Sequence, residues 1–425
     1  MKKYTPYILL ALYFFVYTIP QNLLTIVHSY DKIVNQIFFI SVLNIVGFIY
    51  LFKEYKNVNI LDILKQNYHL LSYCVIIFLA MLSITVAENK VESLITLSRY
   101  LSFLFSFFII LFLSFKINKT YLYFFLSLSM IAIFIESFFI NLMIFDSVII
   151  NGNFLERSNE FRGFGGNVNI SSFSILSKCL IPIYILFNSN NKYLKILSCF
   201  FISSSFLSIF LLMSRAAILA LITVFILIFL NVVLSNKKKN YIKSIYLILC
   251  ICFSFLSYNY INDKNITNIV SERFSTIADP QSDASVNQRV TYYSGALSSI
   301  KENPLLGIGI GNWKIQSIVF SKDIIEGYTI PYFVHNDFLQ LAAEIGIIGG
   351  LLYIFFIFYP VIIILKKLVN SFQFDFNFLI LLILTVFIID SLINFPIDRA
   401  INFTFFIFSI AAFYNINKPI RLNEE

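Results

Sequence analysis

Long apolar runs separated by short polar segments account for most of the chain. A helix needs about 20 apolar residues to cross the hydrocarbon core of a bilayer, and twelve runs have roughly that length. The pattern therefore predicts an all-α, polytopic membrane protein with about twelve transmembrane helices. The expected spans lie near residues 5–27, 33–52, 68–87, 94–115, 121–145, 166–187, 193–213, 216–235, 241–261, 337–365, 377–395 and 399–415.

One long hydrophilic segment, residues 262–334, separates the ninth and tenth spans. Apolar residues recur within it at helical spacing and Pro304 ends the run, which predicts an amphipathic helix over about 285–303, lying along the membrane surface. The chain then divides into spans one to nine (1–261), the loop (262–334), and spans ten to twelve with a short tail (335–425). The residues of the expected apolar face are Val290, Tyr293, Leu297 and Ile300.

Composition supports a membrane protein and excludes a soluble one. Of 425 residues, 59% are hydrophobic and only 13% are charged, against roughly 25% charged in soluble domains. The net charge of +8 does not indicate nucleic acid binding, because the basic residues cluster in short segments between apolar runs. With a cytoplasmic N-terminus, seventeen Lys and Arg fall in inner loops and seven in short outer loops. Both termini are therefore expected in the cytoplasm, and the long loop outside.

Three basic side chains are candidates for chemistry. Arg215 occupies the polar break between two apolar runs and predicts a tight outer hairpin, although an interfacial snorkelling role is the alternative. Arg289 opens the expected loop helix, where a solvated surface arginine is the alternative. His335 begins the tenth span, where a helix cap or packing residue is the alternative. The predicted topology places all three at the same membrane face.

These residue types suit the transfer of a sugar from a lipid diphosphate. Arginine forks bind diphosphate oxygens bidentately and stabilise a diphosphate leaving group, so Arg215 and Arg289 are expected to bind it. A histidine such as His335 accepts a proton from an attacking hydroxyl. Asn336 and Glu344 are expected to support the site, although a structural role for Glu344 is equally compatible with its place in the span. The outer segments contain no carboxylate cluster typical of a metal site, and we expect no metal and no cofactor.

Two further patterns predict an ion pair within the membrane and a turn in the long loop. Glu136 and Lys178 lie at similar depth in the fifth and sixth spans and are expected to form an intramembrane ion pair. The glycines Gly307, Gly309 and Gly311 follow a helix ended by proline rather than a strand, which indicates a turn and not a dinucleotide-binding loop.

The tenth span contains several glycines and one proline. Its glycines Gly346, Gly349 and Gly350 are expected to permit close helix packing. A bend is expected around Pro360.

Three segments of the second half resemble the bacterial O-antigen ligase and O-antigen polymerase superfamily of membrane glycan transferases. They run from Ser214 to Leu219, from Asn303 to Trp313 and from His335 to Gly346. The first half is similar only in hydropathy. The resemblance implies an all-helical fold, an undecaprenyl diphosphate-linked glycan donor, and metal-independent transfer that inverts the anomeric carbon. It also implies that the arginines Arg215 and Arg289 bind the donor diphosphate and that His335 activates or positions the acceptor hydroxyl.

We therefore expect the chain to be a glycosyltransferase, a multi-pass protein of the bacterial inner membrane with its active site at the periplasmic face. The expected partners are the lipid-linked donor, a glycolipid or glycan acceptor and membrane lipids. The preferred hypothesis is an O-antigen ligase, with lipid A–core as the acceptor. The alternative is a polymerase, which would use the same donor but transfer the glycan to another lipid-linked repeat unit. A protein-glycosylating transferase would share the ligase-like motifs. A transporter or flippase of lipid-linked sugars would also need about twelve spans, but not the long outer loop.

Overall fold

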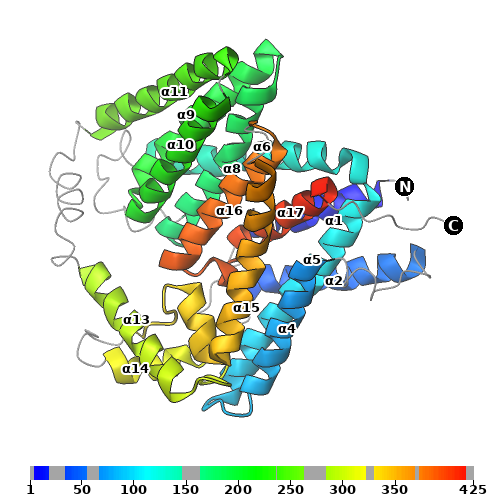
Figure 1. Cartoon of the computed structure of the whole chain (residues 1–425), viewed down its shortest axis with the longest axis vertical. Helices are drawn as coiled ribbons and strands as arrows, with labels where there is room; N and C mark the ends of the chain where they lie inside the picture. The colour runs from blue at the N-terminus through cyan, green and yellow to red at the C-terminus, as the bar shows by residue number, and fades with distance from the viewer. Residues whose placement is uncertain are drawn as a thin grey trace.

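The computed structural model describes residues 4–18, 34–54, 67–145, 163–235, 237–262, 284–321, 330–368 and 373–417 (Figure 1). All regular structure in these residues is helical, which confirms the predicted all-α class. Twelve apolar helices lie within or along the twelve expected spans; ten are long enough to cross a membrane, while α1 and α4 are shorter. Residues 19–27 of the first expected span lie outside the described residues. These helices are α1 (Thr5–Phe14), α2 (Val34–Glu54), α4 (Tyr68–Ser83), α5 (Lys90–Lys116), α6 (Asn118–Phe145), α8 (Val168–Asn188), α9 (Lys192–Leu212), α10 (Arg215–Ser235), α11 (Lys238–Asn262), α15 (Asp337–Leu368), α16 (Phe376–Ile393) and α17 (Ala400–Asn417).

The described part of the segment between the ninth and tenth spans contains two helices, α13 (Ala284–Glu302) and α14 (Trp313–Ser321). Figure 1 shows both at one end of the bundle, beside α15. The first confirms the expected loop helix. Tyr293 and Ile300 do pack inward, together with Ala296, whereas Val290 and Leu297 are exposed.

Helices α8 and α17 form the centre of the bundle. In α17, 89% of the apolar window is buried inside the protein, and in α8, 83%, against 22% in the peripheral α11. Small polar residues on α8, among them Ser171, Ser172 and Ser174, are buried and allow close approach of neighbouring helices. This centre supports the helices whose ends carry the candidate site.

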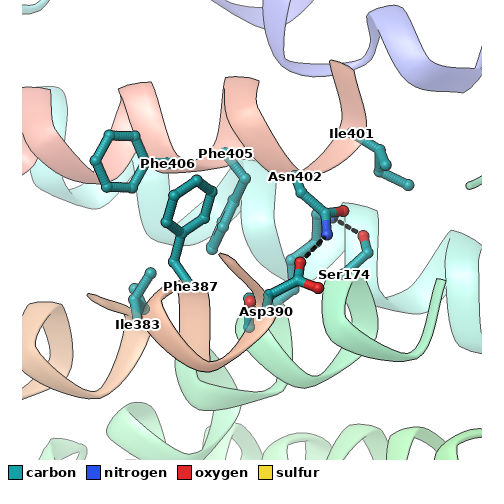
Figure 2. Close-up of a pocket in the computed structure, with 10 residues that line it drawn as sticks. Ser174, Ile383, Phe387, Asp390, Ile401, Asn402, Phe405 and Phe406 are labelled. Atoms are coloured by element: carbon teal, nitrogen blue, oxygen red, sulfur yellow. Dashed lines mark hydrogen bonds between the residues drawn. The ribbon is translucent and has the colours of Figure 1, made fainter. Parts of the chain in front are cut away.

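The predicted ion pair between Glu136 and Lys178 is confirmed. Lys178 Nζ lies 2.9 Å from Glu136 Oε1, and Ser174 Oγ donates to Glu136 Oε2 at 2.7 Å. Figure 2 shows a small pocket lined by both polar and apolar residues, Lys178 among them, where Asn402 of α17 points toward Asp390 of α16. Asn402 Nδ2 donates to Asp390 Oδ2 at 2.6 Å. Hydrogen bonds of this kind offset the large cost of placing charged groups at membrane depth.

Helix α15 is broken near its N-terminal end. Ile345 (φ −125°, ψ 15°) and Gly346 (φ 84°, ψ 167°) leave the helical region, whereas Pro360 lies within the helix that follows. This break lies fourteen residues before Pro360, where the expected bend stays a prediction. The glycines near it do permit close packing, but between the two halves of α15: a Cβ on Gly350 would lie 3.2 Å from Ala342 Cα.

The glycine-rich segment before α14 fills this break. Ile308 N donates to Ala343 O at 2.9 Å, Gly309 N to Glu344 O at 3.0 Å, and Ile347 N to Pro304 O at 2.9 Å. These bonds satisfy backbone groups that the break leaves without helical partners. The close approach requires glycine, because a Cβ on Gly307 would lie 2.4 Å from Ala343 O. The predicted turn is thus confirmed, and it holds the start of α15. We call these contacts of residues 304–309 with residues 343–347 the clasp.

Candidate active site

His335 precedes α15 in an unusual backbone conformation. Its φ is +60°, in the left-handed region that side chains other than glycine rarely adopt. The residues around it hold this conformation. Val334 N donates to Gln340 Oε1 at 3.1 Å, and Asn336 Oδ1 accepts from Leu339 N at 3.0 Å as the N-terminal cap of α15. A strained residue held by several contacts is typical of functional sites.

Tyr293 connects α13 to His335. Its hydroxyl lies 3.0 Å from the carbonyl oxygen of His335 and 3.2 Å from that of Leu392 at the end of α16, and it donates to these acceptors. Arg289 lies four residues earlier on α13, hence on the same helical face. Tyr293 therefore turns the Arg289 side of α13 toward His335, and the structure brings these two predicted residues together.

The imidazole of His335 lies between aromatic rings and positive charges. Tyr292 stacks at 6.3 Å between ring centroids, and Phe395 meets the imidazole edge to face at 5.0 Å. Burial, followed by the charges of Arg289 and Arg399, lowers the pKa of His335 from 6.5 to about 3. The imidazole is therefore neutral at physiological pH and retains a lone pair that accepts a proton. Within the described part of the chain, its Nδ1 is buried without a hydrogen-bond partner.

Arg399 is a further residue of this site, which the sequence analysis did not single out. It follows the 3₁₀ turn η4 (Pro396–Asp398) and its guanidinium carbon lies 4.7 Å from the centroid of Phe395. No local motif marks it. The only signal in the sequence is an arginine at an outer helix end, which is equally typical of an interfacial residue.

Asp337 fixes that turn against the start of α15. Its Oδ2 accepts from Tyr353 Oη at 3.0 Å and from Ile397 N at 3.3 Å. The same turn is held from α5 by an ion pair between Arg99 and Asp398 at 3.3 Å. Asp337, which directly follows the predicted Asn336, thus positions the segment that carries Phe395 and Arg399.

Arg215 is the first residue of α10 and is half-buried. The two-residue turn before it confirms the predicted tight hairpin: Met213 has a φ of +50°, and Ser214 Oγ donates to Asn169 Oδ1 on α8 at 2.7 Å. Helix α10 packs along α16, the helix whose end contacts Tyr293. That Arg215 and His335 contact the same substrate molecule remains a prediction.

The two predicted supporting residues have structural roles. Asn336 caps α15, as described above. Glu344 is buried, and its Oε1 accepts from Trp313 N at 3.1 Å, so that a carboxylate lies at the N-terminus of α14, where the helix dipole favours negative charge. Glu344 thereby joins α14 to the break in α15. Both residues act on the backbone that carries His335. Among the described residues, no group of three His, Cys, Asp or Glu side chains is placed to hold a metal ion.

Residues 199–354 match a family model described as O-antigen ligase. The matched stretch begins in α9, ends in α15, and contains all three residues predicted for catalysis. It also spans the three segments that suggested the resemblance, which is thereby confirmed. No curated protein matches the chain in sequence.

Proposed function

We propose that this chain, whose residues 199–354 match the O-antigen ligase family model, transfers a glycan from an undecaprenyl diphosphate carrier to an acceptor at the outer face of a bacterial inner membrane. The coarser activity, membrane glycan transfer of the ligase or polymerase type, follows from the family. The donor, the acceptor and the roles of individual residues are our proposal.

In the proposed step, an acceptor hydroxyl oxygen forms a bond to the anomeric carbon on the side opposite the diphosphate. The bond from that carbon to the diphosphate oxygen breaks, and its electron pair remains with the diphosphate. The hydroxyl proton passes to a ring nitrogen of His335. A single displacement of this kind inverts the anomeric carbon. It requires no metal if arginines stabilise the charge on the leaving group.

The observation that supports this assignment most strongly is the neutral imidazole of His335 beside two guanidinium groups. A general base must be unprotonated, and burial together with Arg289 and Arg399 maintains that state by lowering its pKa to about 3. When a diphosphate binds the guanidinium groups, its negative charge offsets theirs, and the imidazole then becomes a stronger base. The proposal therefore couples donor binding to the activation of the acceptor hydroxyl.

Ligase is the first choice of acceptor chemistry, because the matching family model carries that description. A polymerase would use the same donor and the same three residues. The two differ only in whether the attacking hydroxyl belongs to lipid A–core or to a second lipid-linked repeat unit.

The test is transfer by the purified full chain in lipid nanodiscs with an undecaprenyl diphosphate-linked oligosaccharide. Arg215→Ala, Arg289→Ala and His335→Ala should each lower product formation by about 10²-fold or more, the typical contribution of a catalytic base or of one charge-stabilising group. Lys301→Ala is the control, since this exposed residue lies at the far end of the same helix as Arg289. Near-normal product from all three variants would remove the site assignment.

The acceptor is decided in the same assay. A product on lipid A–core identifies a ligase, and a longer lipid-linked glycan identifies a polymerase. Movement of the intact donor between leaflets, without transfer, would identify a transporter and contradict the proposal.

A further inference from the structure

Arg399 lies outside the residues that match the family model, yet it shares a neighbour with His335. Its guanidinium carbon lies 4.7 Å from the centroid of Phe395 and 5.6 Å from that of Phe333. These two rings stack on each other with centroids 4.0 Å apart. Phe395 also contacts the imidazole of His335 edge to face at 5.0 Å. One aromatic ring thus touches both the predicted base and an additional arginine.

The position of Arg399 is built by three separate elements. Its own N donates to Pro396 O at 3.1 Å within η4. Asp337 of α15 accepts a hydrogen bond from Ile397 N. Arg99 of α5 forms an ion pair with Asp398, the residue directly before Arg399. The backbone that presents Arg399 is therefore fixed relative to the start of α15, which follows His335 directly.

Two aromatic rings attract the guanidinium of Arg399 and fix its place beside the imidazole. A guanidinium is also the side chain whose planar fork matches phosphate oxygens bidentately. The charge also acts on the site, because Arg399 is one of the causes of the lowered pKa of His335.

We propose that Arg399 is a third donor-binding residue, which contacts the diphosphate of the lipid-linked donor beside His335. This inference rests on the proposed function. A diphosphate diester carries about two negative charges, and about one more develops on the leaving oxygen as the glycosidic bond breaks. Arg215 and Arg289 match the charge of the bound donor, and Arg399 supplies the cation for the charge that develops during the reaction. Its contribution is therefore larger in the transition state than in the ground state.

The first experiment measures binding of farnesyl diphosphate and farnesyl monophosphate to the full chain in nanodiscs. Arg399→Gln should weaken binding of the diphosphate by about tenfold, the value of one charge-assisted hydrogen-bonded contact. Binding of the monophosphate should change much less. Lys301→Gln removes the same charge from an exposed position and should change neither affinity. Melting temperatures of all variants show whether the fold is retained.

The second experiment uses steady-state transfer. Arg399→Lys keeps the charge but loses the bidentate fork, and it should lower kcat by more than it raises KM for the donor. This variant also serves as the binding test if Arg399→Gln does not fold, with weaker farnesyl diphosphate binding expected. A purely structural arginine would alter the melting temperature without this preference for diphosphate over monophosphate.

The outcomes separate this inference from the proposed function. Wild-type farnesyl diphosphate affinity in the Arg399 variants, with loss of affinity in Arg289→Gln, would overturn the role of Arg399 and leave the proposed function intact. If the wild-type chain does not distinguish farnesyl diphosphate from the monophosphate, both proposals fail.

Discussion

At the scale of single residues, the chemistry of His335 depends on contacts that lie far from it in sequence. Its backbone conformation is held by Gln340 and Asn336, its carbonyl accepts from Tyr293, and its ring lies against Phe395. The residue itself was predicted from its position after the long loop. Its environment was not, because a low pKa arises from burial and from charges contributed by α13 and the end of η4.

The lowered pKa of His335 makes stability depend on pH in a defined direction. An unfolded histidine has a pKa near 6.5, so between pH 6.5 and about 3 the unfolded state binds the proton more readily than the folded state. The stability contributed by the neutral imidazole is complete above pH 6.5 and is lost as the pH falls toward 3. At pH 5 the loss is on the order of 2 kcal/mol.

Melting temperatures of the detergent-solubilised chain between pH 7 and pH 4.5 measure this effect. The wild-type melting temperature should fall more steeply with acidification than that of His335→Gln, which cannot bind the proton. His69→Gln serves as a comparison, because His69 is also buried but hydrogen-bonds Tyr414 at a distant position. Parallel pH curves for wild type and His335→Gln would mean that His335 has an ordinary pKa.

At the scale of helices, hydropathy predicted all twelve apolar elements, because the thickness of the bilayer imposes the length of each run. It did not predict the break in α15, since Ile345 and Gly346 read as apolar residues within a continuous span. Nor did it predict the nine-residue helix α14, which is too short to give a clear periodic signal. The contacts of α13 with the protein could not be predicted either, because the residues that pack around Ala296 come from other parts of the chain.

The break in α15 gives a prediction at this scale. Gly346→Ala should destabilise the fold severely, because its φ of +84° is strained for alanine and the new Cβ would lie 2.1 Å from Leu305 O. The clasp between Pro304 and Ile347 would have to separate, and His335 would lose its support. We expect a loss of several degrees or more in melting temperature and a loss of transfer activity.

Ile348→Ala is the matched control for this substitution. Ile348 lies two residues away but is exposed, so its truncation should leave the melting temperature nearly unchanged. Thermal unfolding monitored by size-exclusion chromatography compares the two variants. Equal melting temperatures for Gly346→Ala and wild type would show that the clasp does not hold the two halves of α15.

At the scale of the whole molecule, the proposed function requires α13, His335 and the start of α10 to lie at the outer membrane face. The distribution of Lys and Arg supports this orientation, since basic residues favour cytoplasmic loops. It also agrees with the tight α9–α10 hairpin, which places Arg215 at the opposite end of α10 from the basic segment before α11. The bundle alone does not carry this information, because its packing is the same whichever end faces the cytoplasm.

Labelling of single cysteines in intact cells tests the orientation. All five native cysteines are free thiols and are first replaced by serine or alanine. Lys301→Cys, at the exposed end of α13, should react with a membrane-impermeant maleimide, because α13 must be outside to meet a translocated donor. Lys239→Cys, exposed near the start of α11, should react only after the membrane is made permeable. The reverse pattern would put the imidazole and its arginines in the cytoplasm, on the side away from a translocated donor, and the chain could not then act as proposed.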